Sequence, residues 1–335
     1  MFELKRKKVL QASTNSITPK TIKKEGDGYL PIRKHIIQIN DTISFNIYFS
    51  AEPEEISLLL KNGTTISPED KQKIKSLKQL YVSENGKSEY DSFLEKHLAT
   101  VLKNSSLTID EKTDLIYQSG SELTQSLLKN PTAPGNLKRA EKIVSPILHS
   151  IIQHEDTIAS FIKIIEYDYY THTHSLNVSI YSLSLAAELN FNEKDLTSLG
   201  RAALLHDIGK SEIEHNIVNK KGKLTIGEYK TMESHPELGH KIALNMGVTD
   251  SDILDGIRHH HEKLDGMGYP DNLKEDEITL FPRIICICDI FDALTTRRSY
   301  KDAMSAFDAL YLMKKEKNKK VDIDILNSFV KMLHN

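Results

Sequence analysis

The sequence predicts an α+β protein, with a small α/β region in the first part of the chain and an all-helical bundle in the rest. In residues 43–49 (ISFNIYF), apolar and polar residues alternate with a period of two, which is typical of a half-buried strand. From Asn136 onward the pattern is helical almost throughout. The 335 residues are enough for two domains and a sizeable core.

The first region should contain a hairpin, two short helices and a further strand. Residues 34–39 (KHIIQI) and 43–49 flank an Asn-Asp pair, which indicates a hairpin turn. Residues 52–63 (EPEEISLLLKNG) are typical of a short helix that ends at a glycine. A Ser-Pro start followed by acidic residues predicts a second helix over 67–78, and 79–84 (QLYVSE) is expected to be a strand.

Longer helices should follow. Helical patterns cover 88–104 and 108–130, and KNPTAPG (129–135) is typical of a linker. Residues 137–168 are expected to form one long helix that bends at Pro146. The sequence therefore predicts a small accessory or regulatory α/β domain over 1–130, a linker and the start of a long connecting helix over 131–150, and a helical domain over 151–335.

The composition argues against several classes of protein. The formal net charge of −3 gives no support to a nucleic-acid-binding or membrane-binding role. Only two cysteines occur, Cys286 and Cys288, so no disulfide framework is expected and the chain is typical of an intracellular protein. The basic start lacks the apolar part of a secretory leader, and no run of 18 apolar residues occurs. We therefore expect a cytoplasmic location without membrane insertion.

Histidines are concentrated in the second half of the chain, in four clusters. These are His172 with His174; His206 with Asp207 and Lys210; His235 with His240; and His259 with His260 and His261. A lone histidine on a helix is more often a surface or core residue than a ligand. Asp289 is harder to explain in this way, because it lies in the apolar run RIICICDIFDAL and a buried carboxylate needs a cation or several donors.

Metal binding accounts for the whole set. Neutral imidazole and carboxylate groups suit iron, manganese, zinc and related ions, whereas a calcium site would offer only oxygen ligands. Two ions about 4 Å apart need several protein ligands and usually one bridging carboxylate. Because adjacent residues of a helix point in different directions, His260 and His261 are expected to serve different ions. Lys210 lies three residues after Asp207 on the same helix face, where an ammonium group can meet an anionic substrate or a leaving oxygen.

These motifs resemble a known family. LLHDIGK (204–210) is similar to the His-Asp motif of the HD superfamily of metal-dependent phosphohydrolases, and HHEKLDGMGYP (260–270) resembles the signature of its HD-GYP branch. Other matching segments follow the family's order: HSLNVS (174–179), HPELG (235–239), DIFDALTTRRSYK (289–301) and VDIDILNSFV (321–330). The resemblance covers 151–333 and implies an all-α HD-type helical bundle.

The resemblance also implies the metal ligands. They are His174, His206, Asp207, His235, His260, His261 and Asp289, with Asp207 as the bridging carboxylate. A subset of the family binds a third ion through a glutamate one helical turn before the first histidine. Tyr170 stands at that position, and Asp168 and Glu166 are out of phase with it, so two ions of iron or manganese are expected.

Other residues of the motifs have implied roles of a different kind. Gly268 and Tyr269 of the glycine-rich loop, together with Arg298 and Lys301, match positions that border or contact substrate. The loop is also implied as a docking surface for protein partners such as diguanylate cyclases. Its simpler interpretation is a turn that caps a helix. His172 and His240 match no ligand position, and His259 lies outside the family's histidine doublet.

Hydrolysis of the 3′–5′ phosphodiester of cyclic di-GMP is the activity that the resemblance implies, in bacterial signal transduction. The implied mechanism uses a hydroxide that bridges the two ions, with Asp207 and Lys210 as catalytic residues. Two alternatives stay open: a cyclic di-GMP receptor or docking module with little turnover, and a phosphodiesterase for another cyclic dinucleotide. The product, a homodimer and the signal sensed by the first domain are also left open.

Overall fold

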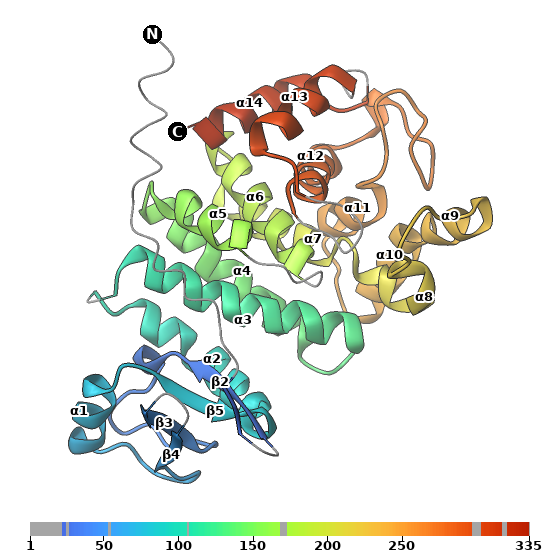
Figure 1. Cartoon of the computed structure of the whole chain (residues 1–335). Coiled ribbons are helices and arrows are strands. Elements are labelled where there is room, and N and C mark those ends of the chain that lie inside the picture. Colours follow the sequence, from blue (N-terminus) through green and yellow to red (C-terminus); the bar gives the residue numbers. More distant parts are fainter. Residues whose placement is uncertain are drawn as a thin grey trace. The chain divides into compact units, whose positions relative to one another are not determined.

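The computed structural model describes residues 22–24, 27–52, 55–105, 107–167, 173–296, 303–316 and 320–334 (Figure 1). The chain divides into two compact units, Met1–Val101 and Leu102–Asn335. Within the described residues the first unit holds a sheet with helices, and the second unit is built from helices. The protein is therefore α+β, as the sequence predicts.

Unit 1 is built on a five-stranded antiparallel sheet. In spatial order the strands are β1 (Ile22–Lys24), β2 (Asp27–Ile32), β5 (Leu80–Ser83), β3 (Ile47–Glu52) and β4 (Glu55–Leu60). The period-two alternation is visible in the burial of Ile43, Phe45 and Ile47, which are at most 2% exposed. The strand itself begins only at Ile47, so the first part of the alternating segment supplies core side chains from a loop.

Two elements of unit 1 differ from the expectation. Residues 52–63, expected to be helical, contain strand β4, which pairs with β3 through partners such as Phe49 and Ser57. This pairing supplies backbone hydrogen bonds at the edge of the sheet and overrides the local helical pattern. Residues 34–39 do not form a hairpin strand, because Lys34–Ile36 is a 3₁₀ turn that buries Ile36.

The helices of unit 1 begin where the sequence predicts. Helix α1 (Pro68–Ser76) starts after Ser67, whose hydroxyl accepts a hydrogen bond from the Asp70 amide while the Asp70 carboxylate accepts one from the Ser67 amide. This reciprocal pair satisfies two amides at the start of the helix. Helix α2 (Lys87–Leu102) follows β5 and buries one apolar face.

Unit 2 consists of helices of very different length. They are α3 (Ile109–Lys129), α4 (Asn136–Gln153), α5 (Thr157–Tyr167), α6 (His174–Glu188), α7 (Glu193–Leu205), the 3₁₀ helix η4 (Ile208–Glu212), α8 (His215–Val218), α9 (Ile226–Met232), α10 (His235–Asn245), α11 (Ser251–His259), the 3₁₀ helix η5 (Glu275–Glu277), α12 (Leu280–Thr295), α13 (Ala306–Glu316) and α14 (Ile323–His334). Within these described segments, none of the helices combines the length and apolar character that a bilayer crossing requires.

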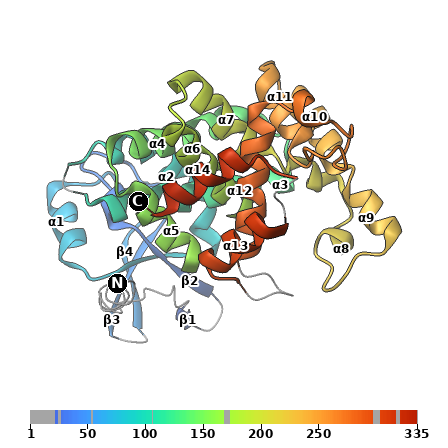
Figure 2. The same ribbon diagram turned by 90° about the horizontal axis from the view of Figure 1, so that it is seen from above.

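Helix α6 lies in the middle of unit 2, where α7, α12, α4 and α14 contact it (Figures 1 and 2). All its side chains from Ser175 to Ala186 are buried. Helix α11 contacts both α7 and α12. In both views α8 and α9 extend away from the rest of the bundle. This packing brings the start of α6, the end of α7, the start of α10 and the end of α11 close to α12.

The long helix expected over 137–168 is interrupted. Helix α4 ends at Gln153 and α5 begins at Thr157, while Pro146 lies inside α4 without ending it. The Ser150 carbonyl oxygen in the last turn of α4 accepts both from the His154 amide at 3.1 Å and from the Thr157 hydroxyl at 2.7 Å, so the start of α5 is bonded to the end of α4.

The boundary between the units also falls earlier than the expected limit at residue 130. Helix α3 contacts α4, α5 and α6 and therefore belongs to unit 2. The segment that joins α3 to α4 is a short turn inside this unit rather than a linker between domains.

Candidate metal centre

The seven predicted ligands come from five places in unit 2 and converge in one region, which we call the buried cluster. His174 and His235 are the first residues of α6 and α10, His206 and Asp207 lie between α7 and η4, His260 and His261 follow α11, and Asp289 lies within α12. His206, Asp207, His235 and His260 are at most 4% exposed. Most of these residues lie at helix ends, where five separate elements can present side chains to one point.

Three imidazoles of the buried cluster are oriented in the same way. In each, Nδ1 donates a hydrogen bond to the backbone carbonyl three residues earlier. The pairs are His206 with Ala203 at 2.7 Å, His235 with Met232 at 2.7 Å, and His260 with Ile257 at 2.8 Å. The proton of the neutral ring is therefore on Nδ1, and the lone pair of Nε2 faces the cluster, as metal binding requires.

His174 is oriented by a second carboxylate that the sequence interpretation missed. Its Nδ1 donates to Asp292 Oδ2 at 2.6 Å, and its Nε2 lies 3.0 Å from Asp289 Oδ1. Asp292 is fully buried, one helical turn after Asp289. The signal was present in the sequence, because Asp292 is the second acid in the apolar run of α12. A carboxylate behind a histidine raises the basicity of the ligand and fixes its ring.

Asp207 lies at the centre of the cluster, and its two oxygens face different histidines. Oδ2 is 3.6 Å from His174 Nε2 and 3.5 Å from His206 Nε2. Oδ1 is 3.2 Å from His235 Nε2 and 4.0 Å from His260 Nε2. Two atoms bound to one ion at about 2.1 Å lie about 3 Å apart when adjacent and about 4 Å apart when opposite. Both sets of distances fit ligands that share a metal ion.

Several atoms of the cluster need a cation. His206 Nε2 and Asp207 Oδ1 are buried and have no hydrogen-bond partner in the described part of the chain. The Nε2 atoms of His235 and His260 face each other at 3.2 Å, although the Nδ1 atom of each ring already makes a hydrogen bond to a carbonyl. Two lone pairs this close repel each other unless a positive charge lies between them. The residues present therefore fit a divalent metal ion.

The protonation states of three rings agree with this interpretation, whereas the hydrogen bonds to Asp289 and Asp292 outweigh burial and raise the pKa of His174 to about 9, so this ring must release a proton when it binds an ion. Burial lowers the pKa of His206 and lowers that of His260 further, and it lowers the pKa of His261 to about 3. These rings are neutral at physiological pH and available as ligands. Burial alone would raise the pKa of Asp207, but Lys210 and the facing histidines hold it well below its usual range, so the carboxylate is charged.

The ligands form two groups that share Asp207. One contains His174 and His206, and the other contains His235, His260 and His261. The expectation that His260 and His261 serve different ions is therefore not supported. Helix α11 ends at His259, so these two residues lie in a turn and both point to the second group. His261 Nδ1 also lies 3.9 Å from Asp289 Oδ2, which connects the two groups on a second side.

Lys210 lies at the edge of the buried cluster, on η4. Its ammonium group donates to Asp207 Oδ2, and its side chain is 27% exposed. Gly209 allows η4 to approach α10, because a Cβ at this position would lie 1.9 Å from the His235 carbonyl oxygen. This close contact fixes η4, which carries Lys210, against the start of α10, which carries His235. The Lys210 ammonium group therefore faces both the buried cluster and solvent.

The loop after the histidines, residues 262–273, is held by Glu262. This carboxylate is 3% exposed and accepts hydrogen bonds from the amides of Asp271 at 2.7 Å and Leu273 at 3.0 Å. A Cβ at Gly268 would lie 2.4 Å from Glu262 Cα, so only glycine permits this path. The loop places the Tyr269 ring 4.7 Å from the ring of His261, beside the cluster.

A group of charged residues, which we call the loop clamp, ties the same loop to α11. Arg258 donates to both carboxylate oxygens of Asp271, at 2.7 and 2.9 Å. His259 lies between two acids, with Nδ1 2.6 Å from Asp255 Oδ1 and Nε2 2.9 Å from Asp271 Oδ2. His259 is thus placed outside the group of ligands, as expected, and both ring nitrogens are occupied.

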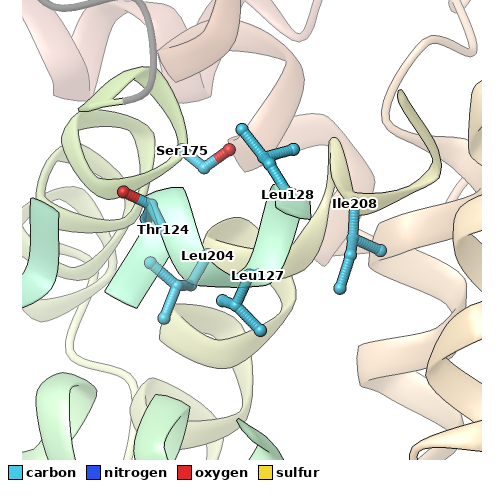
Figure 3. A pocket seen from close by; sticks show the side chains of 6 residues that line it. All are labelled: Thr124, Leu127, Leu128, Ser175, Leu204 and Ile208. Atoms are coloured by element: carbon cyan, nitrogen blue, oxygen red, sulfur yellow. The ribbon is translucent and has the colours of Figure 1, made fainter. Parts of the chain in front are cut away.

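A small recess lies where α3 meets α6, α7 and η4 (Figure 3). It is lined by Thr124, Leu127, Leu128, Ser175, Leu204 and Ile208. Two hydroxyl groups among aliphatic side chains offer no metal ligand set. The recess therefore belongs to the packing of α3 against the helices that carry His174 and His206.

Some predicted residues lie outside the described residues. These are Arg298, Lys301, Tyr170, His172 and Asp168. Of the acids near the third-metal position, Glu166 is described and is exposed on α5. His240 lies on α10 and belongs to neither group of ligands.

Comparisons with known proteins agree with this geometry. A family profile described as HD domain matches residues 136–325. A cyclic di-GMP phosphodiesterase from Pseudomonas aeruginosa is 35% identical over 192 residues, which are 57% of this chain and 46% of that protein. A 3′3′-cGAMP-specific phosphodiesterase from Vibrio cholerae is 31% identical over 251 residues, 72% of this chain and 53% of that protein. The chain spans about half the length of these relatives.

A solved structure shows the same fold. It is that of an HDG"Y"P protein from Bdellovibrio bacteriovorus, with a TM-score of 0.65 and 20% identity, and the match covers 92% of this chain and 100% of the other. The family match extends over more than half of the chain and includes the described ligands. The chain belongs to the HD-domain family, and its HHEKLDGMGYP segment places it in the HD-GYP branch.

Proposed function

We propose that this chain hydrolyses a 3′–5′ phosphodiester bond of a cyclic dinucleotide, with cyclic di-GMP as the first candidate, at a site that holds two divalent metal ions. The observation that carries the proposal is the position of Asp207, whose two oxygens face two different groups of imidazoles. A carboxylate shared in this way is what two adjacent ions require. The names of the relatives support cyclic dinucleotides as the substrate class.

Iron or manganese is the proposed metal. The two groups of ligands offer nitrogen and oxygen atoms, and neither Cys286 nor Cys288 belongs to them. This donor set suits a borderline transition metal rather than a thiolate-bound ion. The count of two ions follows from the shared Asp207 and from Tyr170 at the third-metal position.

The mechanism assigns distinct roles to the residues of the chain. Two bound ions would lower the pKa of a water molecule and neutralise charge on the phosphate oxygens. Asp207 and the imidazoles would hold the two ions beside the scissile bond. Lys210 places a positive charge at the rim of the cluster, where it stabilises the negative charge that develops on phosphate and delivers a proton to the leaving ribose oxygen.

On the side of the loop, we propose that Tyr269 contacts the substrate. Burial raises the pKa of its phenol, so the hydroxyl remains protonated and can donate to a phosphate oxygen or a base. Gly268 acts indirectly, because it permits the close path of the loop over Glu262. Arg298 and Lys301 remain predictions for phosphate or guanine contacts.

A second substrate has specific support. Relatives from Vibrio cholerae that are 31% and 37% identical to this chain carry the name 3′3′-cGAMP-specific phosphodiesterase. The cluster acts on the phosphodiester, which both dinucleotides contain, so discrimination between them must come from residues that contact the bases. A cytoplasmic location, partners at the loop and a homodimer also remain predictions.

The test is a turnover assay on protein purified without oxygen and loaded separately with iron or manganese. Metal content is measured first, and cyclic di-GMP and 3′3′-cGAMP are then offered at equal concentration, with products followed by chromatography. We expect close to two ions per chain and cleavage of at least one substrate to a linear product. Two bound ions with tight binding of cyclic di-GMP and no cleavage would favour the receptor alternative over the enzyme.

A further inference from the structure

A chain of buried hydrogen bonds runs from α3 to the first ligand, and we call it the α3 relay. The Tyr117 hydroxyl donates to Asn177 Oδ1 at 2.8 Å, and Asn177 Nδ2 donates to Asp292 Oδ1 at 2.9 Å. Asp292 Oδ2 accepts from His174 Nδ1 at 2.6 Å. Tyr117, Asn177 and Asp292 are at most 5% exposed, so bulk water does not compete for these bonds.

The relay has only one consistent orientation. A carboxylate can only accept, so the amide nitrogen of Asn177 must face Asp292, and the amide oxygen is left to accept from Tyr117. The Thr296 hydroxyl also donates to Asp292 Oδ1, at 3.0 Å. Both oxygens of Asp292 are thus occupied, and its role is to orient His174 rather than to bind an ion.

Helix α3 is packed closely against the helix that carries His174. A Cβ at Gly120, one turn after Tyr117, would lie 2.7 Å from Leu176 of α6. Farther along α3, Thr124, Leu127 and Leu128 line the recess with residues of α6 and α7 (Figure 3). The family profile begins at residue 136, so this contact comes from a helix that precedes the matched domain.

We propose that Tyr117 is a positioning residue for the metal centre, because its hydroxyl fixes Asn177 and, through Asp292, the ring of His174. The inference rests on the proposed two-metal site. The other oriented imidazoles donate to carbonyls of nearby backbone, and their bonds do not involve α3. A displacement of α3 should therefore weaken the ion on His174 and His206 more than the ion of the second group.

The test measures binding of Co²⁺ to the full chain, because cobalt absorption bands report the geometry of the ligands. Metal-free wild type, Tyr117→Phe, Asp292→Asn and the double variant are titrated against a competing chelator. We expect Asp292→Asn to weaken one of the two binding steps by about 10–100-fold. Tyr117→Phe should weaken the same step by about 3–10-fold, since one buried donor is lost and only part of the effect reaches His174. The absorption bands of the Co²⁺ ion bound in that step should also shift in Tyr117→Phe.

The double variant separates positioning from packing. If Tyr117 acts through Asp292, its removal in the Asp292→Asn background should change binding by less than about 2-fold. Equal losses in both backgrounds would contradict the relay. The matched control is Tyr90→Phe, which removes the buried hydroxyl that accepts from the Arg33 amide in unit 1 and should leave binding unchanged.

The outcomes also separate this inference from the proposed function. If wild type binds no Co²⁺, the proposed metal centre fails and the relay fails with it. If wild type and Tyr117→Phe bind two ions with the same affinities and the same absorption bands, only the relay is overturned.

Discussion

His259 and His260 are neighbours in the sequence but lie in opposite environments. His260 is fully buried among other imidazoles, and burial holds its pKa well below the ordinary value. Burial also disfavours the charged form of His259, but hydrogen bonds to Asp255 and Asp271 outweigh it and raise the pKa. One ring is a neutral candidate ligand of the buried cluster, and the other belongs to the loop clamp, where two carboxylates favour its protonated form. Residue type alone therefore does not decide the role, because the surrounding charges do.

This comparison predicts that changes in the buried cluster alter metal content, whereas changes in the loop clamp alter the loop and leave the metal in place. Four substitutions test it, from the largest expected effect to the smallest.

Asp207→Ala should have the largest effect. The two proposed ions would lose their shared ligand, and each would supply several kcal/mol of charge stabilisation, so turnover should fall by about 10³-fold or more. Metal analysis by mass spectrometry should find that both ions are lost. Asp271→Ala, in the loop clamp, is the matched control and should keep its metal. Normal metal content in Asp207→Ala would mean that the ligands are misassigned.

Lys210→Met tests the rim of the cluster. The charge is removed while a similar length of side chain is kept, so metal content should stay normal and kcat should fall by about 10²–10³-fold. The control Lys220→Met removes another ion-paired lysine, which contacts Glu228 of α9, and should retain full activity. A Lys210→Met enzyme with unchanged kcat would exclude the proposed charge stabilisation and proton delivery.

Glu262→Gln tests the loop beside the cluster. Asp271 and Leu273 donate to different oxygens of Glu262, and a glutamine offers only one acceptor oxygen, so one loop amide loses its acceptor and faces the NH2 group instead. We expect KM to rise by about 3–10-fold with metal content and kcat close to normal, because the proposed role of the loop is to contact substrate rather than the ions. Steady-state kinetics on metal-analysed protein gives both values. Loss of metal in this variant would show that the loop supports the ligands directly.

His259→Ala should have the smallest effect on metal. Its ion pairs with Asp255 and Asp271 are partly exposed, and their loss should cost about 1 kcal/mol or less of the free energy of unfolding. Thermal unfolding and metal analysis are measured on this variant and on His260→Ala. The comparison fails if His259→Ala loses metal to the same extent as His260→Ala.

Much of the candidate site could be predicted from the sequence, because its residues occur in short motifs of fixed order. The structure brings the seven predicted ligands together, six in the two groups and Asp289 beside His174 and His261, and it places His259 apart from them. Asp292 was missed although it is the second acid of an apolar run, and Asn177 was missed because a hydrogen bond between residues 115 positions apart leaves no local pattern. The sequence interpretation assigned His260 and His261 to different ions, whereas the structure places both in one group, because the end of α11 depends on tertiary packing.

For the fold as well, local sequence patterns predict some elements and miss those that depend on contacts between distant residues. Helix α1 has a local signal, the capping residues Ser67 and Asp70, and was predicted correctly. Strand β4 has no such signal, and its partners in β3 decide its conformation. At the break between α4 and α5 the chain leaves the helix at His154 and Thr157 bonds back to Ser150, which a pattern of apolar residues does not reveal.

A crystal structure of the manganese-loaded protein, with anomalous scattering used to locate the ions, tests the central claim most directly. The account predicts two ions that share Asp207, one bound to each oxygen, with His174 and His206 on one ion and His235 and His260 on the other. A single ion, or two ions that Asp207 does not bridge, would contradict it.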